Sequence, residues 1–342
     1  MARLLEIKAS IVRFYAKFDT YINMLLKFIL AMVLFLIVKN GLGYMKLVSS
    51  VPIILIIALI CCLLPISATL WIGGIVVLLD LYSLTKEAAI VGLILFAVVY
   101  FVYFRFCPKD STIAALTPIM GKLGIPYVMP VMSGLLRPIY SVISIACGTI
   151  VYYFLDGVRQ NAAMLTSASE NSSSEKLKVL VGLIADNKEM DAVLISMVLA
   201  SLIIYLIRRL KVDYAWSIAW IAGVLVQLLS VIVVSLILSV SPHIAGLIVG
   251  SLLGVVVGVV LQFFCMNLDY QRVERVQYED DEYYYYVTAV PKRVVAAKEK
   301  QVKQFGNTGR IPRTQQVPTG DTTVLDRKAL AQELDIDEDL LK

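Results

Sequence analysis

Residues 243–266 read HIAGLIVGSLLGVVVGVVLQFFCM, an apolar run without a lysine, arginine, aspartate or glutamate. About 20 such residues in an α-helix cross the ~30 Å hydrocarbon core of a bilayer, so this stretch predicts a transmembrane helix. The whole chain of 342 residues is 59% hydrophobic and 17% charged, whereas a soluble domain is roughly 45–50% apolar and about 25% charged. This composition excludes a soluble enzyme, a disordered protein and a disulfide-rich secreted module.

Similar runs recur along the chain and predict an all-α polytopic membrane protein, with a bundle of about eight transmembrane helices in residues 21–266. The longest apolar stretch, 47–84, contains Pro65, which predicts two helices joined by a tight turn. Gln227 lies midway along one predicted span, and its amide predicts a hydrogen bond between helices. The expected spans are 22–39, 47–64, 67–84, 88–106, 135–155, 191–208, 215–240 and 243–266.

The orientation of the bundle follows from its positive charges. Arg208, Arg209 and Lys211 lie in a short loop between two spans, and positive residues in short loops stay in the cytoplasm. Alternation from this loop places both termini in the cytoplasm and the 156–190 loop outside. Only Lys39 and Lys46, which would lie in an outer loop, disagree with this pattern. The sequence therefore predicts a multi-pass protein of the cell membrane.

Residues 1–20 have the pattern of an amphipathic helix. Leu4, Ile7, Ile11, Phe14 and Phe18 recur at three- and four-residue spacing, which places them on one helical face. Basic residues flank this face, so the helix is expected to lie in the headgroup layer of the bilayer. The alternative is a helix that packs against the cytoplasmic side of the bundle.

Segment 107–134 is too apolar for an ordinary loop, and prolines and glycines break it too often for a spanning helix. Non-helical backbone at membrane depth requires cover from protein or from a water-filled cavity. The segment is therefore interpreted either as a re-entrant hairpin of the kind that frames transporter binding sites, or as a cytoplasmic elbow on the membrane surface. The candidate residues of a transport path are Asp80, Pro118, Gly121, Gly124, Pro126 and Pro130.

The last span carries the most specific pattern in the chain. Its glycines, Gly246, Gly250, Gly254 and Gly258, recur every four residues and so lie near one helix face. Close packing at small residues drives much of the association between helices in lipid. This glycine face predicts tight contact with another helix, either within the chain or across a homo-oligomer interface.

Few residues in the spans suggest chemistry. Asp80 is the one ionisable side chain in a span that is a fair candidate for a mechanism. The chain has a single histidine, His243, and it has no CxxC pair, no nucleophile or metal-binding motif and no phosphate-binding glycine loop. We therefore expect no catalytic activity, no metal and no cofactor.

Residues 267–342 differ from the rest, with 12 Lys and Arg and 14 Asp and Glu. The overall net charge of +5 therefore arises in the membrane body, where it indicates anionic lipid and not nucleic acid as the partner. This region is predicted to be a largely disordered cytoplasmic tail with one strand at 278–290. Within that strand, the candidates for docking a cytosolic partner or a second copy of the chain are Tyr283, Tyr284, Tyr285, Tyr286 and Val287. The alternative is that the tyrosines anchor this segment at the membrane interface.

Two functions are compatible with these features. In the first, the bundle is a transporter of the permease or channel-like type, and because it has no ATPase motif a separate subunit would supply any energy. In the second, the bundle is an anchor or scaffold that recruits cytosolic or envelope partners through its tail. The number of spans and the irregular 107–134 segment favour transport.

Overall fold

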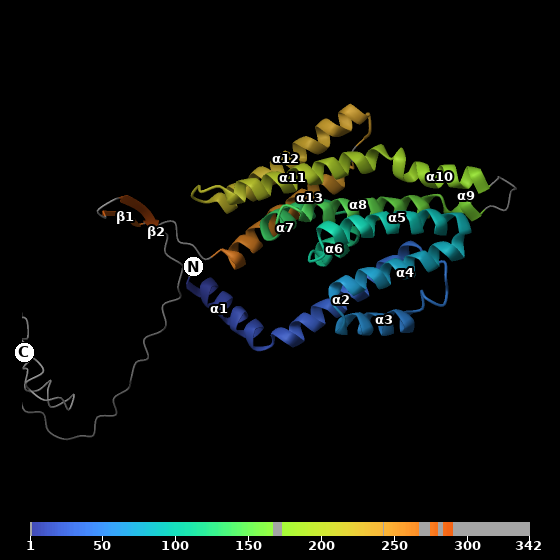
Figure 1. The fold of residues 1–342 in the computed structure, drawn as a ribbon, viewed down its shortest axis with the longest axis horizontal. Coiled ribbons are helices and arrows are strands. Elements are labelled where there is room, and N and C mark those ends of the chain that lie inside the picture. The colour runs from blue at the N-terminus through green and yellow to red at the C-terminus, as the bar shows by residue number, and fades with distance from the viewer. Residues whose placement is uncertain (1, 167–172, 242, 267–273, 280–282, 290–342) are drawn as a thin grey trace, which may run out of the picture. The chain divides into compact units, whose positions relative to one another are not determined.

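The structure is a computed structural model that describes residues 2–166, 173–241, 243–266, 274–279 and 283–289 (Figure 1). The described part is a helical bundle followed by one β-hairpin. By contacts, the chain divides into Met1–Val295 and Ala296–Lys342. All of the second unit lies outside the described residues, and so does most of the predicted 267–342 tail.

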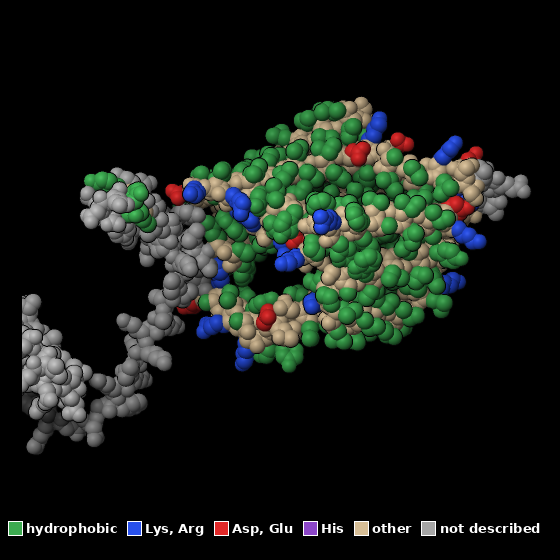
Figure 2. Space-filling view, viewed as in Figure 1, with side chains coloured by type: hydrophobic (Ala, Val, Ile, Leu, Met, Phe, Trp, Pro, Cys, Tyr) green, Lys and Arg blue, Asp and Glu red, His purple; other side chains and the backbone are tan. Residues whose placement is uncertain are grey.

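Seven helices in the described residues are long and apolar enough to cross a membrane, which is consistent with an all-α membrane protein. Hydrophobic side chains cover much of the bundle surface in Figure 2, as expected for helices that face lipid. The seven are α2 (Asp19–Gly41), α4 (Ile66–Leu84), α5 (Lys86–Phe106), α8 (Ser141–Gln160), α11 (Lys188–Arg209), α12 (Ala215–Leu238) and α13 (Ile244–Cys265).

The predicted span at 47–64 is shorter than expected. It forms α3 (Val51–Leu63) of 13 residues, about 20 Å at 1.5 Å per residue, whereas the hydrocarbon core is ~30 Å thick. Residues before Val51 are held in a loop, since the backbone N–H of Met45 donates to Asp80 Oδ1 at 3.0 Å. Pro65 separates α3 from α4. The structure therefore does not confirm a count of eight spans.

Helix α1 (Ala2–Lys17) keeps part of its apolar face uncovered. Ile7, Ile11 and Phe14 are exposed, as they would be in a helix that lies in the headgroup layer. Lys8 is buried on the other side, where its Nζ donates to the carbonyl of Phe263 and lies 5.2 Å from the centre of that ring. A lysine in this position caps a free carbonyl in the last turn of α13.

Segment 107–134 folds into the bundle as a hairpin of short helices: α6 (Ser111–Lys122), the 3-10 turn η1 (Pro126–Val128) and α7 (Met129–Leu136). The hairpin reverses at Gly124, whose φ of +76° is one that glycine adopts without strain. Its two ends meet at an ion pair, in which Arg137 Nη1 lies 3.5 Å from Asp110 Oδ1. The segment thus enters the bundle and turns back, so that its two ends lie close together.

The first arm of the hairpin packs on α8, and the two helices run parallel. A Cβ on Gly148 would lie 2.6 Å from Thr117, and a Cβ on Gly121 would lie 2.7 Å from the ring of Tyr152. Such distances require glycine, because a methyl group at either position would overlap its neighbour. The missing side chains therefore let α6 lie directly against α8.

The second arm packs on α11, and α11 also anchors its end. Ser133 Oγ and Ser201 Oγ are hydrogen-bonded at 2.8 Å. Arg208 donates to the carbonyl of Leu135 and, at 3.4 Å, to that of Arg137. These bonds satisfy carbonyls that the end of α7 leaves free. The second arm of the hairpin and its end are thus fixed by α11.

The glycine face of α13 packs against the same hairpin within the chain. A Cβ on Gly246 would lie 3.1 Å from the carbonyl oxygen of Gly124, and one on Gly250 would lie 3.1 Å from Tyr127. Gly254 faces Val131, while Gly258 faces the indole of Trp220 on α12. This contact within the chain occupies the glycine face of α13, for which the sequence predicted either an internal contact or a homo-oligomer interface.

Two short helices connect α8 to α11 at the end of the bundle where α11 begins (Figure 1): α9 (Ala162–Thr166) and α10 (Ser173–Ala185). After the bundle, strands β1 (Glu274–Glu279) and β2 (Tyr284–Ala289) pair antiparallel, with Tyr278 opposite Tyr285. The predicted strand 278–290 is thus represented mainly by β2. Its partner strand, β1, was not anticipated.

Candidate functional site

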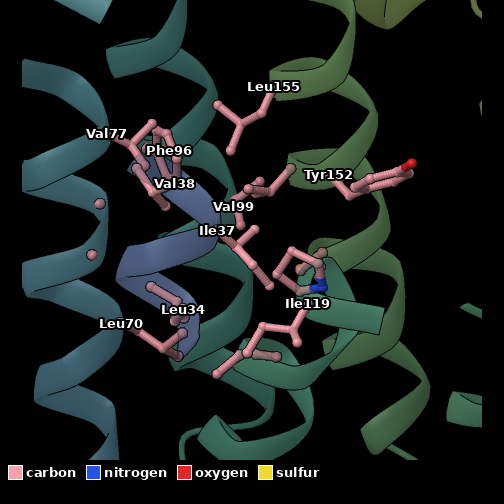
Figure 3. A pocket seen from close by; sticks show the side chains of 18 of the residues that line it. Leu34, Ile37, Val38, Leu70, Val77, Phe96, Val99, Ile119, Tyr152 and Leu155 are labelled. Carbon is pink, nitrogen blue, oxygen red and sulfur yellow. The ribbon is translucent and has the colours of Figure 1, made fainter. Parts of the chain in front are cut away.

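Five helices surround a cavity of about 120 Å³ inside the bundle. Figure 3 shows its side chains converging from α2, α4, α5, α6 and α8. Most of them are aliphatic or aromatic. Those that define the walls are Leu34, Ile37 and Val38 of α2, Leu70 and Val77 of α4, Phe96 and Val99 of α5, Ile119 of α6, and Leu155 of α8.

Three tyrosines line the cavity, Tyr100, Tyr103 and Tyr152, and the hydroxyl groups of the first two donate within the bundle. Tyr100 donates to the carbonyl of Leu70 at 2.5 Å, and Tyr103 donates to Ser111 Oγ at 3.0 Å. The ring of Tyr100 also lies 4.6 Å from that of Trp71. Because these two hydroxyls already donate to the protein, Tyr100 and Tyr103 present mainly apolar surface to the cavity.

Charged groups gather at one end of the cavity and are called the charged rim: Lys122, Asp156 and Arg159. Lys122 Nζ lies 3.5 Å from Asp156 Oδ1, and each of the two side chains is about a quarter exposed. The other carboxylate oxygen of Asp156 accepts from Gln160 Nε2 at 2.7 Å. The Arg159 side chain is exposed, and no ion pair is found for it among the described residues.

The parallel packing of α6 on α8 creates this rim. Lys122 ends α6, whereas Asp156 and Arg159 lie in the last turns of α8. Close contact at Gly121 and Gly148 brings the end of α6 to the level of Asp156. The same two helices therefore supply both the apolar wall and the charged groups beside it.

The proposed transport residues are distributed over several places. Pro118 lines the cavity, and Gly121 lies behind it against Tyr152. Gly124 and Pro126 are at the hairpin tip, with Gly124 facing α13. Pro130 is buried in the second arm. The structure thus places Pro118 and Gly121 beside the cavity. Gly124, Pro126 and Pro130 belong to the turn and to the second arm of the hairpin.

Asp80 lies outside the cavity. It is 1% exposed and lines a separate small pocket with Lys39 and Ser49. Its carboxylate accepts the Met45 N–H, and its carbonyl accepts from Ser83 Oγ at 2.9 Å. In this structure Asp80 holds the loop between α2 and α3.

The rim residues are the ones that the sequence did not single out as a site. A signal was present: Lys122 follows Gly121 directly, and Asp156 and Arg159 are ionisable groups one helical turn apart at the end of an apolar helix. What the sequence could not supply was the packing of α6 beside α8.

Two further features concern metal binding and the predicted docking residues. Among the residues that the structure describes, no three His, Cys, Asp or Glu side chains come close enough to hold a metal ion. In the β-hairpin segment, Tyr283, Tyr284, Tyr285 and Val287 are exposed, whereas the side chain of Tyr286 lies outside the described set. The docking candidates that can be placed are thus available at the surface.

No family model, curated protein or solved structure matches this chain. The function is therefore inferred from the geometry of the cavity and its rim.

Proposed function

We propose that this protein is a membrane transport component of the permease or channel-like type, in which at least the apolar part of a solute passes through the cavity. The observation that carries the proposal is the cavity of about 120 Å³ between α2, α4 and α5 on one side and α6 and α8 on the other. The hairpin that supplies one wall supports it, since broken helices often frame the binding sites of transporters.

The lining favours an apolar or amphipathic solute over an inorganic ion. A bare charge in such surroundings would lose its hydration without gaining polar partners, which is strongly unfavourable. The sequence has no phosphate-binding glycine loop, so we expect either passive movement or a separate energising subunit. The proposal keeps the predicted location in the cell membrane, with both termini in the cytoplasm.

Reconstitution tests this proposal. The full chain is placed in liposomes with a radiolabelled lysophospholipid, and albumin then extracts the lipid that reaches the outer leaflet. We expect translocation faster than in protein-free liposomes. If the protein moves neither an anionic nor a zwitterionic lysophospholipid faster than protein-free liposomes do, the transport proposal fails.

A variant that blocks the cavity sharpens the test. Gly41 lines the cavity, and a Cβ there has no heavy atom within 4 Å, so Gly41→Leu fits without overlap at Cβ and fills part of the space. It is expected to return translocation to the protein-free rate. Gly182→Leu is the matched control, because Gly182 lies on α10 away from the cavity and a Cβ there would have its nearest neighbour at 3.6 Å.

A scaffold function is the second candidate, and the exposed tyrosines beside and within β2 favour it. Aromatic side chains on a strand suit the pairing of a partner's strand at the sheet edge. Affinity purification in mild detergent tests this role. A cytosolic or envelope protein that copurifies with the full chain, and is lost when residues 274–342 are deleted, would favour the scaffold. A homo-oligomer that survives the deletion would not.

A further inference from the structure

We infer that the ligand of the cavity is an anionic single-chain amphiphile, with its hydrocarbon chain among the apolar walls and its head beside Lys122 and Arg159. This inference names the substrate class of the same site and so rests on the proposed function. It commits to a lysophospholipid-like molecule with one chain and a net negative head. Binding and movement are measured separately, so that each claim can fail alone.

The charge of the rim favours an anion. Two cations and one carboxylate line this end of the cavity, and the carboxylate already has two partners, Lys122 and Gln160. Arg159 is exposed and has no ion pair within the described part of the chain. A guanidinium offers several N–H donors in a planar fork that fits phosphate and carboxylate oxygens. An anionic head would gain that partner, whereas a cationic head would meet repulsion from both cations.

The size and polarity of the cavity favour a single chain. Its volume of about 120 Å³ is close to that of an engineered apolar cavity of about 150 Å³, which stays dry and binds benzene. That space accepts a segment of one hydrocarbon chain and is too small for two side by side. The hydroxyls of Tyr100 and Tyr103 already donate within the protein, so a polar group would gain little from these two side chains.

The head, more than the chain, must determine selectivity. A hydrocarbon chain is already in apolar surroundings in the bilayer, so its transfer into an apolar cavity contributes little. The charged rim is different, because Lys122 and Asp156 are only about a quarter exposed, and water screens charges at such a site less than free charges in solution. We therefore expect discrimination by head charge among lipids that have the same chain.

The test compares two ligands of equal chain length, lysophosphatidylglycerol and lysophosphatidylcholine, on the purified full chain in a non-ionic detergent. The anionic lipid is expected to bind about tenfold tighter, the effect of one charge-assisted hydrogen bond. Arg159→Gln should weaken its binding by about tenfold and leave the zwitterionic lipid unchanged. Asp156→Asn should tighten anion binding, because it removes the repulsive carboxylate but keeps an oxygen for Gln160. Lys188→Gln, which removes an exposed cation that is not part of the rim, is the control and should have no effect.

Equal binding of the two lipids, or an Arg159→Gln variant that binds as the unmodified chain does, would overturn the inference. An Asp156→Asn variant with weaker anion binding would also count against it, since that result would indicate a merely structural role for the rim. Selective binding without translocation would leave the ligand assignment standing and remove the transport function. Translocation of both lipids at equal rates, with no selective binding, would leave the transport function standing and remove the ligand assignment.

Discussion

Ile204 of α11 lies between two glycines on neighbouring helices, and this arrangement predicts a specific pattern of rescue. A Cβ on Gly223 of α12 would lie 2.0 Å from Ile204 Cγ1 and 2.4 Å from Cδ1. A Cβ on Gly134 of α7 would lie 2.7 Å from both Cβ and Cγ2 of the same residue. Ile204 is 0% exposed, and a β-branched side chain in a helix has one strongly preferred χ1. It therefore cannot turn away from one glycine without approaching the other.

Each glycine-to-alanine change should destabilise the bundle. For Gly223→Ala the contact must open by more than 1 Å to reach the ordinary 3.4 Å, and overpacking of this kind costs about 1–3 kcal/mol. Ile204→Ala removes Cγ1, Cγ2 and Cδ1 but keeps Cβ. In the Ile204→Ala background, Gly223→Ala should therefore cost nothing, since Ile204 Cβ lies at an ordinary 3.5 Å. Gly134→Ala should still cost about 1–3 kcal/mol there, because its overlap with Cβ at 2.7 Å remains.

The assay is the free energy of unfolding of the purified chain in mixed micelles as the fraction of denaturing detergent increases. Gly182→Ala controls for the change from glycine to alanine itself, because a Cβ there has its nearest neighbour at 3.6 Å. It should be neutral or stabilise the helix by up to about 1 kcal/mol. If the costs of Gly223→Ala and Ile204→Ala simply add, or if Ile204→Ala rescues both glycine variants equally, the packing described for these three helices is wrong.

Three shorter predictions concern other parts of the bundle. Lys8→Met should destabilise the chain by about 1 kcal/mol, because the carbonyl of Phe263 loses its hydrogen-bond donor. Chemical unfolding measures the change, and an unchanged free energy of unfolding would contradict the capping of α13 by Lys8. Burial raises the pKa of Asp110 above its usual 3.8, so the folded chain binds a proton more readily than the unfolded chain. Stability therefore falls as pH rises from the usual pKa to the raised one. Asp110→Asn should remove this fall, measured as melting temperature against pH, and an unaltered slope would exclude this carboxyl as its cause. Asp80→Asn keeps an oxygen for the Met45 N–H and should leave lysophospholipid translocation unchanged. Asp80→Ala, which removes that oxygen, should lower the free energy of unfolding by about 1–3 kcal/mol. A loss of translocation in Asp80→Asn would instead place Asp80 on the transport path.

The sequence predicted features that depend on composition and on spacing within one helix. Apolar runs identified the long helices, and the four-residue glycine repeat predicted close packing on one face of α13. Gln227 does make a bond between helices, since its Nε2 donates to the carbonyl of Tyr127 at 3.1 Å. In each case the information lies within a single stretch of sequence and needs no knowledge of which helices are neighbours.

The features that escaped prediction depend on which helices become neighbours. Lys122 and Asp156 are far apart in the sequence, and only the parallel docking of α6 on α8 brings them to 3.5 Å. The predicted span 47–64 was too long because nothing local reveals that Asp80 holds the preceding loop through Met45. Hydropathy counts apolar residues in a window and carries no information about such tertiary contacts.

The contrast between the cavity and the rest of the bundle supports a binding role. Elsewhere the chain removes side chains to bring helices into contact, as at Gly148 against Thr117 and at Gly250 against Tyr127. Yet the same hairpin, with α8, borders an empty volume of about 120 Å³. The apolar side chains that line this space lack protein contacts on the side that faces it. The hairpin does not fill the space, and it is held by contacts with α11 and α13, neither of which lines the cavity. A ligand that binds the folded chain stabilises it against unfolding, so the full chain should become more stable in the presence of the anionic lysophospholipid, and Gly41→Leu should reduce that gain.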